Sequence, residues 1–166
     1  MAQVIVAERL YKPAFMAEQT DMPLLVRLDT EQFLRARDMV ANGADDVFYV
    51  FDTVANEVVE APKRSLELGE VKPALEGVFE AKARDGTTVK VTTVFERVKQ
   101  QLQHYSPEQT EDITGVKATI VRRLARRIAN AKACSNITQT HFGKFYHGME
   151  MERSVLLVFA LAGHFG

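Results

Sequence analysis

The chain of 166 residues has no tryptophan, one cysteine and five prolines. With a single thiol, Cys134, it cannot build an internal disulfide framework. It also cannot hold an iron–sulfur cluster by itself, because such clusters need several thiolates. No positively charged residue lies adjacent to Cys134 to activate it, so we expect a buried structural thiol.

Neither sign of charge dominates: the formal net charge is -1 and the isoelectric point is about 6.4. No overall field draws the chain toward nucleic acid, and we expect no nucleic-acid partner. The longest apolar run, Val155–Ala162, is far shorter than the roughly 20 residues that span a bilayer, so no membrane span is predicted. The first residues lack the basic start of a signal peptide, so any targeting segment lies outside this chain.

Several short motifs of catalysis are also missing. The sequence contains no G-x-G-x-x-G, no G-x-x-x-x-G-K-[ST], no G-x-S-x-G and no C-x-x-C. A dinucleotide fingerprint, a P-loop, a nucleophile elbow and a thiol redox pair are therefore not predicted within the chain.

Hydrophobic residues (46%) and charged residues (26%) are balanced as in an ordinary globular domain. Apolar residues at helical spacing cover most of the chain. Helices are expected at 2–10, 13–19, from Asp29 or Thr30 to Leu34, from Phe95, from Pro107 to near Gly115, and at 117–130 and 149–162. The last of these is apolar nearly all round after Ser154, so we expect it to be buried, and residues 133–138 are expected to form a strand.

The middle of the chain changes to the period of β-strands. The runs 47–51 and 58–59 flank a turn at 54–57, and the runs 77–83 and 87–94 flank Asp85-Gly86, a dipeptide favoured in tight hairpins. We therefore predict a β-hairpin-rich insertion at 47–94 within a single segment, 1–166. The fold class is α/β, or α+β if the chain stands alone, mostly helical with a small antiparallel sheet.

Two charged or metal-binding patterns have simpler interpretations. Arg122, Arg123, Arg126 and Arg127 lie on one side of the helix at 117–130, opposite Ile120 and its apolar neighbours. They could grip phosphate, but the balanced overall charge favours a solvated face paired with carboxylates. His141 and His147 match no strong zinc spacing, and no metal ligand is predicted.

The loop from Gln139 to Gly148 is the strongest candidate for ligand contact. It is rich in donors and aromatic residues and precedes the N-terminus of a helix, which favours anionic groups. An ordinary surface loop is the alternative interpretation. The candidate contacts are Gln139, His141, Lys144, Tyr146 and His147.

Three stretches together resemble the molybdopterin oxidoreductase family, the dimethyl sulfoxide reductase superfamily. The first is 4–21, extended by 22–34, which resembles a helical segment of the family's nucleotide-fold domain. The second, Tyr105–Val116 followed by Ile120–Arg127, is the most specific. The third is Phe145-Tyr-His-Gly148 with 152–154 and 161–163; it departs from the common pattern at Met149 and His164.

The resemblance implies that the chain is an interior piece of a catalytic subunit and part of its nucleotide-fold domain. The parent enzyme would use a bis-molybdopterin guanine dinucleotide with molybdenum or tungsten, for two-electron redox or oxygen-atom transfer on a small substrate. The metal ligand and the iron–sulfur cysteines of the family lie before this segment and another pterin-binding domain follows it. The chain would thus carry no catalytic residue and retain no cofactor alone.

By the same resemblance, the loop 139–148 faces the cofactor funnel. The implied partners are the remaining domains of the same subunit and an iron–sulfur electron-transfer subunit, in the periplasm or cytoplasm of a prokaryote. We expect both ends of the chain to be cuts rather than natural termini, and a natural start at Met1 is the alternative interpretation. Two alternatives stay open: a self-contained α+β binding module for a nucleotide-like ligand or a protein partner, and an inactive remnant.

Overall fold

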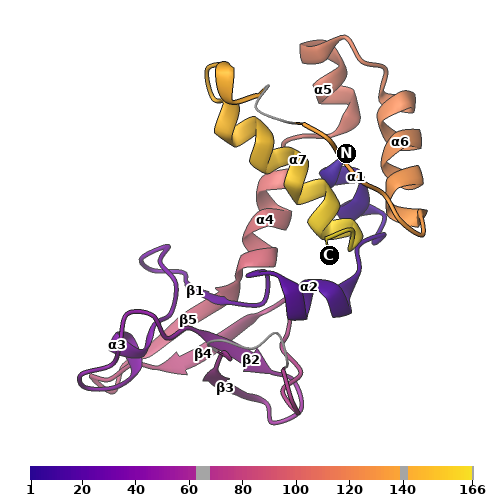
Figure 1. Ribbon diagram of the computed structural model, residues 1–166. Helices are drawn as coiled ribbons and strands as arrows, with labels where there is room; N and C mark the ends of the chain where they lie inside the picture. Colours follow the sequence, from indigo (N-terminus) through magenta and orange to yellow (C-terminus); the bar gives the residue numbers. More distant parts are fainter. Residues whose placement is uncertain (63–67, 139–141, 166) are drawn as a thin grey trace. The chain divides into compact units, whose positions relative to one another are not determined.

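A computed structural model describes residues 1–62, 68–138 and 142–165 (Figure 1). The chain divides into two compact units, Pro13–Val98 and the combination of Met1–Lys12 with Lys99–Gly166. The described residues form α-helices and two small antiparallel sheets, which confirms the mixed α/β class. None of their helices is both long and apolar enough to cross a bilayer.

The unit Pro13–Val98 contains all the strands of the described chain. A three-stranded antiparallel sheet has the order β1 (Leu25–Arg27), β5 (Thr88–Thr93), β4 (Val78–Lys82). A separate hairpin joins β2 (Tyr49–Asp52) to β3 (Glu57–Glu60), with Val50 opposite Val59. Both predicted hairpins are confirmed, and β2 to β5 all lie within 47–94; that this region is an insertion stays a prediction.

The hairpin turns form for local reasons. At the β4–β5 turn, Asp85 Oδ1 accepts hydrogen bonds from the Thr87 backbone N–H at 2.9 Å and its hydroxyl at 2.7 Å. Gly86 takes the left-handed conformation at φ 84°, which costs glycine little. Asn56 takes φ 56° in the β2–β3 turn, and asparagine tolerates this region better than most residues.

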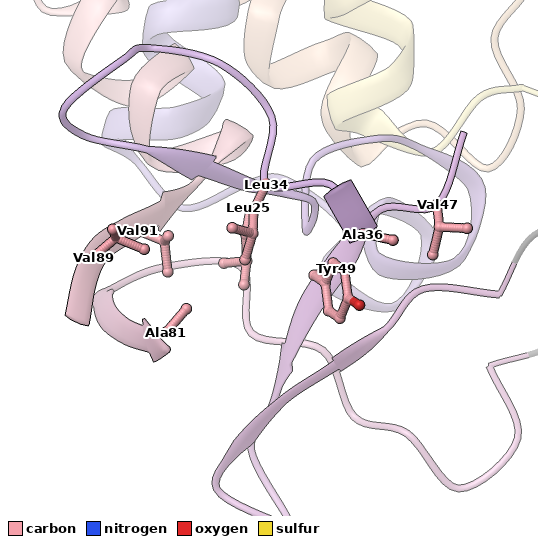
Figure 2. Close-up of a cluster of buried hydrophobic side chains, with 8 residues drawn as sticks. All are labelled: Leu25, Leu34, Ala36, Val47, Tyr49, Ala81, Val89 and Val91. Atoms are coloured by element: carbon pink, nitrogen blue, oxygen red, sulfur yellow. The ribbon is translucent and has the colours of Figure 1, made fainter. Parts of the chain in front are cut away.

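The core of this unit gathers side chains from strands, from loops and from the short helix that begins at Ala36 (Figure 2). Phe51 and Phe79 stack beside it, with ring centroids 3.8 Å apart. Since each buried aliphatic side chain contributes about 1.5–3 kcal/mol, this cluster holds the short strands together. Its buried members are Leu25, Leu34, Ala36, Val47, Tyr49, Ala81, Val89 and Val91.

The helices at the two ends of this unit begin as expected. Pro13 starts α2 (Pro13–Gln19). The first N–H of a helix makes no intrahelical hydrogen bond, so the lack of an N–H on proline costs nothing there. Helix α4 (Val94–Leu102) follows β5 directly. The buried Thr93 hydroxyl accepts a hydrogen bond from the Glu96 N–H at 3.1 Å and donates one to the Leu75 carbonyl.

The helix predicted from Asp29 or Thr30 to Leu34 is wrong. The chain turns back on itself here, with Leu34 N–H donating to the Leu25 carbonyl at 2.8 Å. Arg27 holds the Asp29 carboxylate at 2.7 Å, so Asp29 is engaged by a preceding residue and does not cap a helix. The short helix is instead α3 (Ala36–Met39), where the Asp38 carboxylate accepts from the Arg35 N–H at 3.0 Å.

The other unit is helical. Its helices are α1 (Ala2–Ala7), α5 (Pro107–Thr114), α6 (Ala118–Asn130) and α7 (Gly148–Ala162), with a short 3₁₀ turn, η1 (Phe142–Lys144). Helix α6 packs on α1, α5 and α7.

The predicted start and end of α5 are confirmed. Ser106 Oγ accepts from the Gln109 N–H at 3.2 Å, and the Gln109 side chain accepts from the Ser106 N–H at 3.0 Å, which closes a capping box. Gly115 ends the helix in the left-handed conformation at φ 72°.

Other predictions for this unit need correction. Helix α1 ends at Ala7, short of residue 10, because Arg9 takes φ 53° and the Leu10 N–H turns back to the Ile5 carbonyl. Residues 133–138 form no strand. All the strands of the described chain lie within 25–93 and pair with one another, so none of them pairs with 133–138. Cys134 is half-buried rather than buried.

Helix α7 is only partly buried, which contradicts the expectation from its apolar sequence. Its C-terminal half is covered at Val158, Leu161 and Ala162. Met149 and Leu156 are 69% and 41% exposed. The described part of this unit has too few elements to surround α7 on every side.

Candidate functional site

The turn between η1 and α7 is built on one glycine. The Phe145 N–H donates to the Phe142 carbonyl and the Gly148 N–H donates to the Phe145 carbonyl, each at 3.0 Å. A Cβ placed on Gly148 would lie 1.8 Å from the Phe142 carbonyl oxygen. Only glycine allows the backbone to approach so closely, so any other residue at 148 would force this turn to change its conformation.

The segment preceding the candidate loop is tied to the same helix. The Thr138 hydroxyl donates a hydrogen bond to the Glu152 carboxylate, on the second turn of α7. The chain is therefore hydrogen-bonded to α7 at Thr138, and the Phe142 carbonyl lies close to Gly148, where α7 begins. Two predicted contacts, Gln139 and His141, lie outside the described residues.

The other three predicted contacts come together on the turn. Lys144, Tyr146 and His147 are all exposed, Tyr146 at 89%. The rings of Tyr146 and His147 meet edge to face, with centroids 4.0 Å apart. An ammonium, a phenol hydroxyl and an imidazole are all hydrogen-bond donors, and two of them can be cations, so the turn suits an anionic group.

His147 is the residue before α7 and has an uncommon backbone. Its φ of 58° is in the left-handed region, which few residues other than glycine adopt. Its carbonyl accepts from the Met151 N–H at 3.0 Å, and its ring Nδ1 lies 3.8 Å from the Glu150 carboxylate. The N-terminal N–H groups of this helix carry partial positive charge, which adds to the attraction for an anion.

The arginines of α6 are not assembled as a phosphate site. Arg122 binds the Glu108 carboxylate at 2.6 and 2.7 Å, and Arg126 binds that of Glu8 at 2.7 and 2.9 Å. These hydrogen bonds lower the pKa of each carboxyl group from its ordinary value. The prediction of a solvated face paired with carboxylates is confirmed for these two arginines.

No metal site appears in the part of the chain that the structure describes. None of its histidine, cysteine, aspartate and glutamate side chains gather in groups of three or more. His141, the companion that a site at His147 would need, is outside that part.

Two positioning features were missed from the sequence. The need for glycine at 148 depends on the Phe142 carbonyl, and the Thr138–Glu152 hydrogen bond joins residues 14 apart. A glycine directly after Tyr-His, at the start of an apolar helix, is the signal that could have indicated the first.

Comparison with known proteins places the chain among large oxidoreductase subunits, although no protein-family model matches it. It is 41% identical over 172 residues to chlorate reductase subunit alpha of Ideonella dechloratans, and 39% over 172 to dimethylsulfide dehydrogenase subunit alpha of Rhodovulum sulfidophilum. It is 34% identical over 192 residues to perchlorate reductase subunit alpha of Dechloromonas aromatica. Each match covers 100% of this chain but only 18%, 18% and 21% of the relative.

Proposed function

We propose that this chain, which belongs to the molybdopterin oxidoreductase family (the dimethyl sulfoxide reductase superfamily), helps to hold the cofactor of a catalytic subunit. It corresponds to a part of such a subunit. The proposed cofactor is a bis-molybdopterin guanine dinucleotide with molybdenum or tungsten, and the segment is proposed to belong to the nucleotide-fold domain of the parent enzyme.

The observation that carries this proposal is the turn anchored by Gly148. It holds Lys144, Tyr146 and His147 outward at the N-terminus of a helix of 15 residues. A pterin guanine dinucleotide carries diphosphate groups, and these three donors match that anionic chemistry. By the resemblance to the family, the metal ligand is proposed to come from a part of the subunit that precedes this segment.

The residues of this chain would act by binding and orientation. Lys144 would pair with a phosphate, while Tyr146 and His147 would donate hydrogen bonds to oxygens of the pterin or of the substrate. Gln139 and His141 are proposed as further contacts. The bound cofactor would supply the redox chemistry, and the protein's part is to position it.

The reaction itself is proposed from the relatives. Chlorate reductase, perchlorate reductase and dimethylsulfide dehydrogenase are named for reactions of small molecules. We propose a two-electron redox or oxygen-atom transfer on a small substrate, with the remaining domains and an iron–sulfur subunit as partners. No observation on the described residues favours the alternative of a self-contained binding module.

The test is mutagenesis in the catalytic subunit that carries this segment. Lys144→Ala removes a charge-assisted hydrogen bond of about 1.5–3 kcal/mol, so retained cofactor should fall about tenfold or more under dilution. His147→Gln should reduce it by a smaller factor, and Lys132→Ala, an exposed lysine outside the turn, is the control. Metal and guanine nucleotide released per subunit are the readouts; retention equal to the control in both variants would contradict the proposal.

A further inference from the structure

Helix α6 buries its alanines most deeply, exposes two of its large apolar residues and leaves the other two, Val121 and Ile128, half-buried. Ala125 and Ala129 are 0% and 1% exposed where the helix packs on its neighbours, whereas Ile120 and Leu124 are 44% and 45% exposed. Burial of larger apolar side chains is worth more free energy, so a helix that completes its own core would face the other way. The buried alanines, which we call the alanine stripe, therefore form one packing face of α6. The exposed Ile120 and Leu124 mark a second.

The second face extends beyond α6. Val116, Ile120 and Leu124 recur every four residues, and Ile113, on the last turn of α5, is 81% exposed. The α5–α6 apolar face is defined here as these four residues. Ion pairs hold the two helices together, Arg122 with Glu108 and Lys117 with Glu111 at 2.6 Å each, so the face belongs to a packed helix pair.

Two cations border this face, which corrects the expectation that all four arginines of α6 lie opposite Ile120 and its apolar neighbours. Arg123 follows Ile120 by three residues and Arg127 follows Leu124 by three, so each arginine lies beside the apolar row. Both are exposed, and neither forms an ion pair with any of the described residues, unlike Arg122 and Arg126. A matching surface would be apolar at its centre and carry carboxylates opposite the two arginines.

We propose that the α5–α6 apolar face is the docking surface for another part of the same catalytic subunit. This rests on the proposed function, because it takes the chain to be one part of that subunit. The chain matches 18% of the chlorate reductase and dimethylsulfide dehydrogenase alpha subunits, so most of such a subunit is available to cover the face. Apolar rows with a polar border are typical of buried contact surfaces.

The experiment measures thiol reactivity in the native catalytic subunit that carries this segment. Leu124→Cys and Ile113→Cys place thiols on the face, and Asn130→Cys places one at an exposed position of the same helix. Each is labelled with a neutral maleimide and compared with the same subunit in urea. Mass spectrometry of the labelled peptide separates these thiols from other cysteines. Because two positions on the face are tested, the experiment can still be interpreted if one variant folds poorly.

We expect Leu124→Cys and Ile113→Cys to react at least about tenfold more slowly than Asn130→Cys after correction for the unfolded rates. Rates within about threefold of the control would overturn the proposal. Protection that disappears on dilution of a subunit dimer would overturn it in favour of a second copy. Protection already present in the 166-residue chain alone would overturn it in favour of another part of this chain.

The docking proposal and the cofactor proposal fail separately. Cofactor content is measured on the same samples. If Lys144→Ala retains its full cofactor while the thiol at 124 is protected, the docking surface stands and the cofactor contact is wrong. If Lys144→Ala loses its cofactor while the thiol at 124 reacts freely, the cofactor contact stands and the docking surface is wrong.

Discussion

At the scale of single residues, Asp52 shows how a carboxylate holds a loop in place. It is 7% exposed, and its Oδ1 accepts hydrogen bonds from the Val54 N–H at 2.9 Å and the Lys72 N–H at 3.2 Å. These backbone donors, Val54 first, outweigh the effect of burial and lower the pKa of Asp52 below its ordinary value of 3.8. The charged carboxylate is thus the form that the fold stabilises.

A pH dependence follows for Asp52→Asn in this chain. Because the folded pKa is depressed, the contribution of the charge is present above about pH 4 and is lost as the pH falls through the folded pKa. Asp52→Asn should lower the urea midpoint near pH 7, and its difference from the parent should shrink toward pH 3.

The control for this prediction is Asp21→Asn, which changes an exposed aspartate of the same unit. It should leave the urea midpoint near that of the parent at both pH values. A midpoint difference for Asp52→Asn that stays constant from pH 7 to pH 3 would contradict the assignment of a depressed pKa.

Residue-level signals could be read from the sequence only where they act locally. Ser106 and Gln109 were predicted as a capping box because both partners lie within one turn of helix. Asp29 was misjudged because its partner, Arg27, precedes it and a long side chain decides the outcome. The requirement for glycine at 148 was missed, since its cause is the position of the Phe142 carbonyl, which only the structure gives.

At the scale of elements, the hairpins and the longer helices were predictable and the packing of the helices was not. Asp85-Gly86 determines its turn through its own side chain and backbone, so the β4–β5 hairpin could be predicted. Residues 133–138 were predicted as a strand but form none, because a strand needs a neighbouring strand to pair with and the described chain provides none for them. Helices α6 and α7 expose apolar residues, which periodicity alone would place inside.

The two faces of α6 predict opposite responses to substitution in this chain. Ala125→Leu forces extra methylene groups into a fully buried site, so it should destabilise the fold by about 1–3 kcal/mol. Leu124→Ala, one residue away, removes a partly exposed side chain and should change the free energy of unfolding by no more than about 0.5 kcal/mol.

Urea unfolding followed by circular dichroism measures both effects. A large loss of stability for Leu124→Ala would mean that the α5–α6 apolar face is already covered within this chain. A neutral Ala125→Leu would mean that the alanine stripe is not a close contact.

At the scale of the whole molecule, the chain is two compact units that correspond to part of a larger subunit. The resemblance seen in the sequence is confirmed by relatives that match it over 100% of its length. The proposed site was predicted from the sequence as a region, Gln139 to Gly148, and its role stays a prediction. Its geometry came from the structure, through the anchored turn at 142–148 and the hydrogen bond from Thr138.

The central claim is that this turn touches the cofactor, and hydrogen–deuterium exchange tests it most directly. The measurement compares the catalytic subunit that carries this segment with and without bound cofactor, following the peptide that spans 142–150. The account predicts that its amides exchange about tenfold more slowly in the loaded subunit, while the β2–β3 hairpin peptide exchanges equally in both. Identical exchange at 142–150, with protection confined to other peptides, would contradict it.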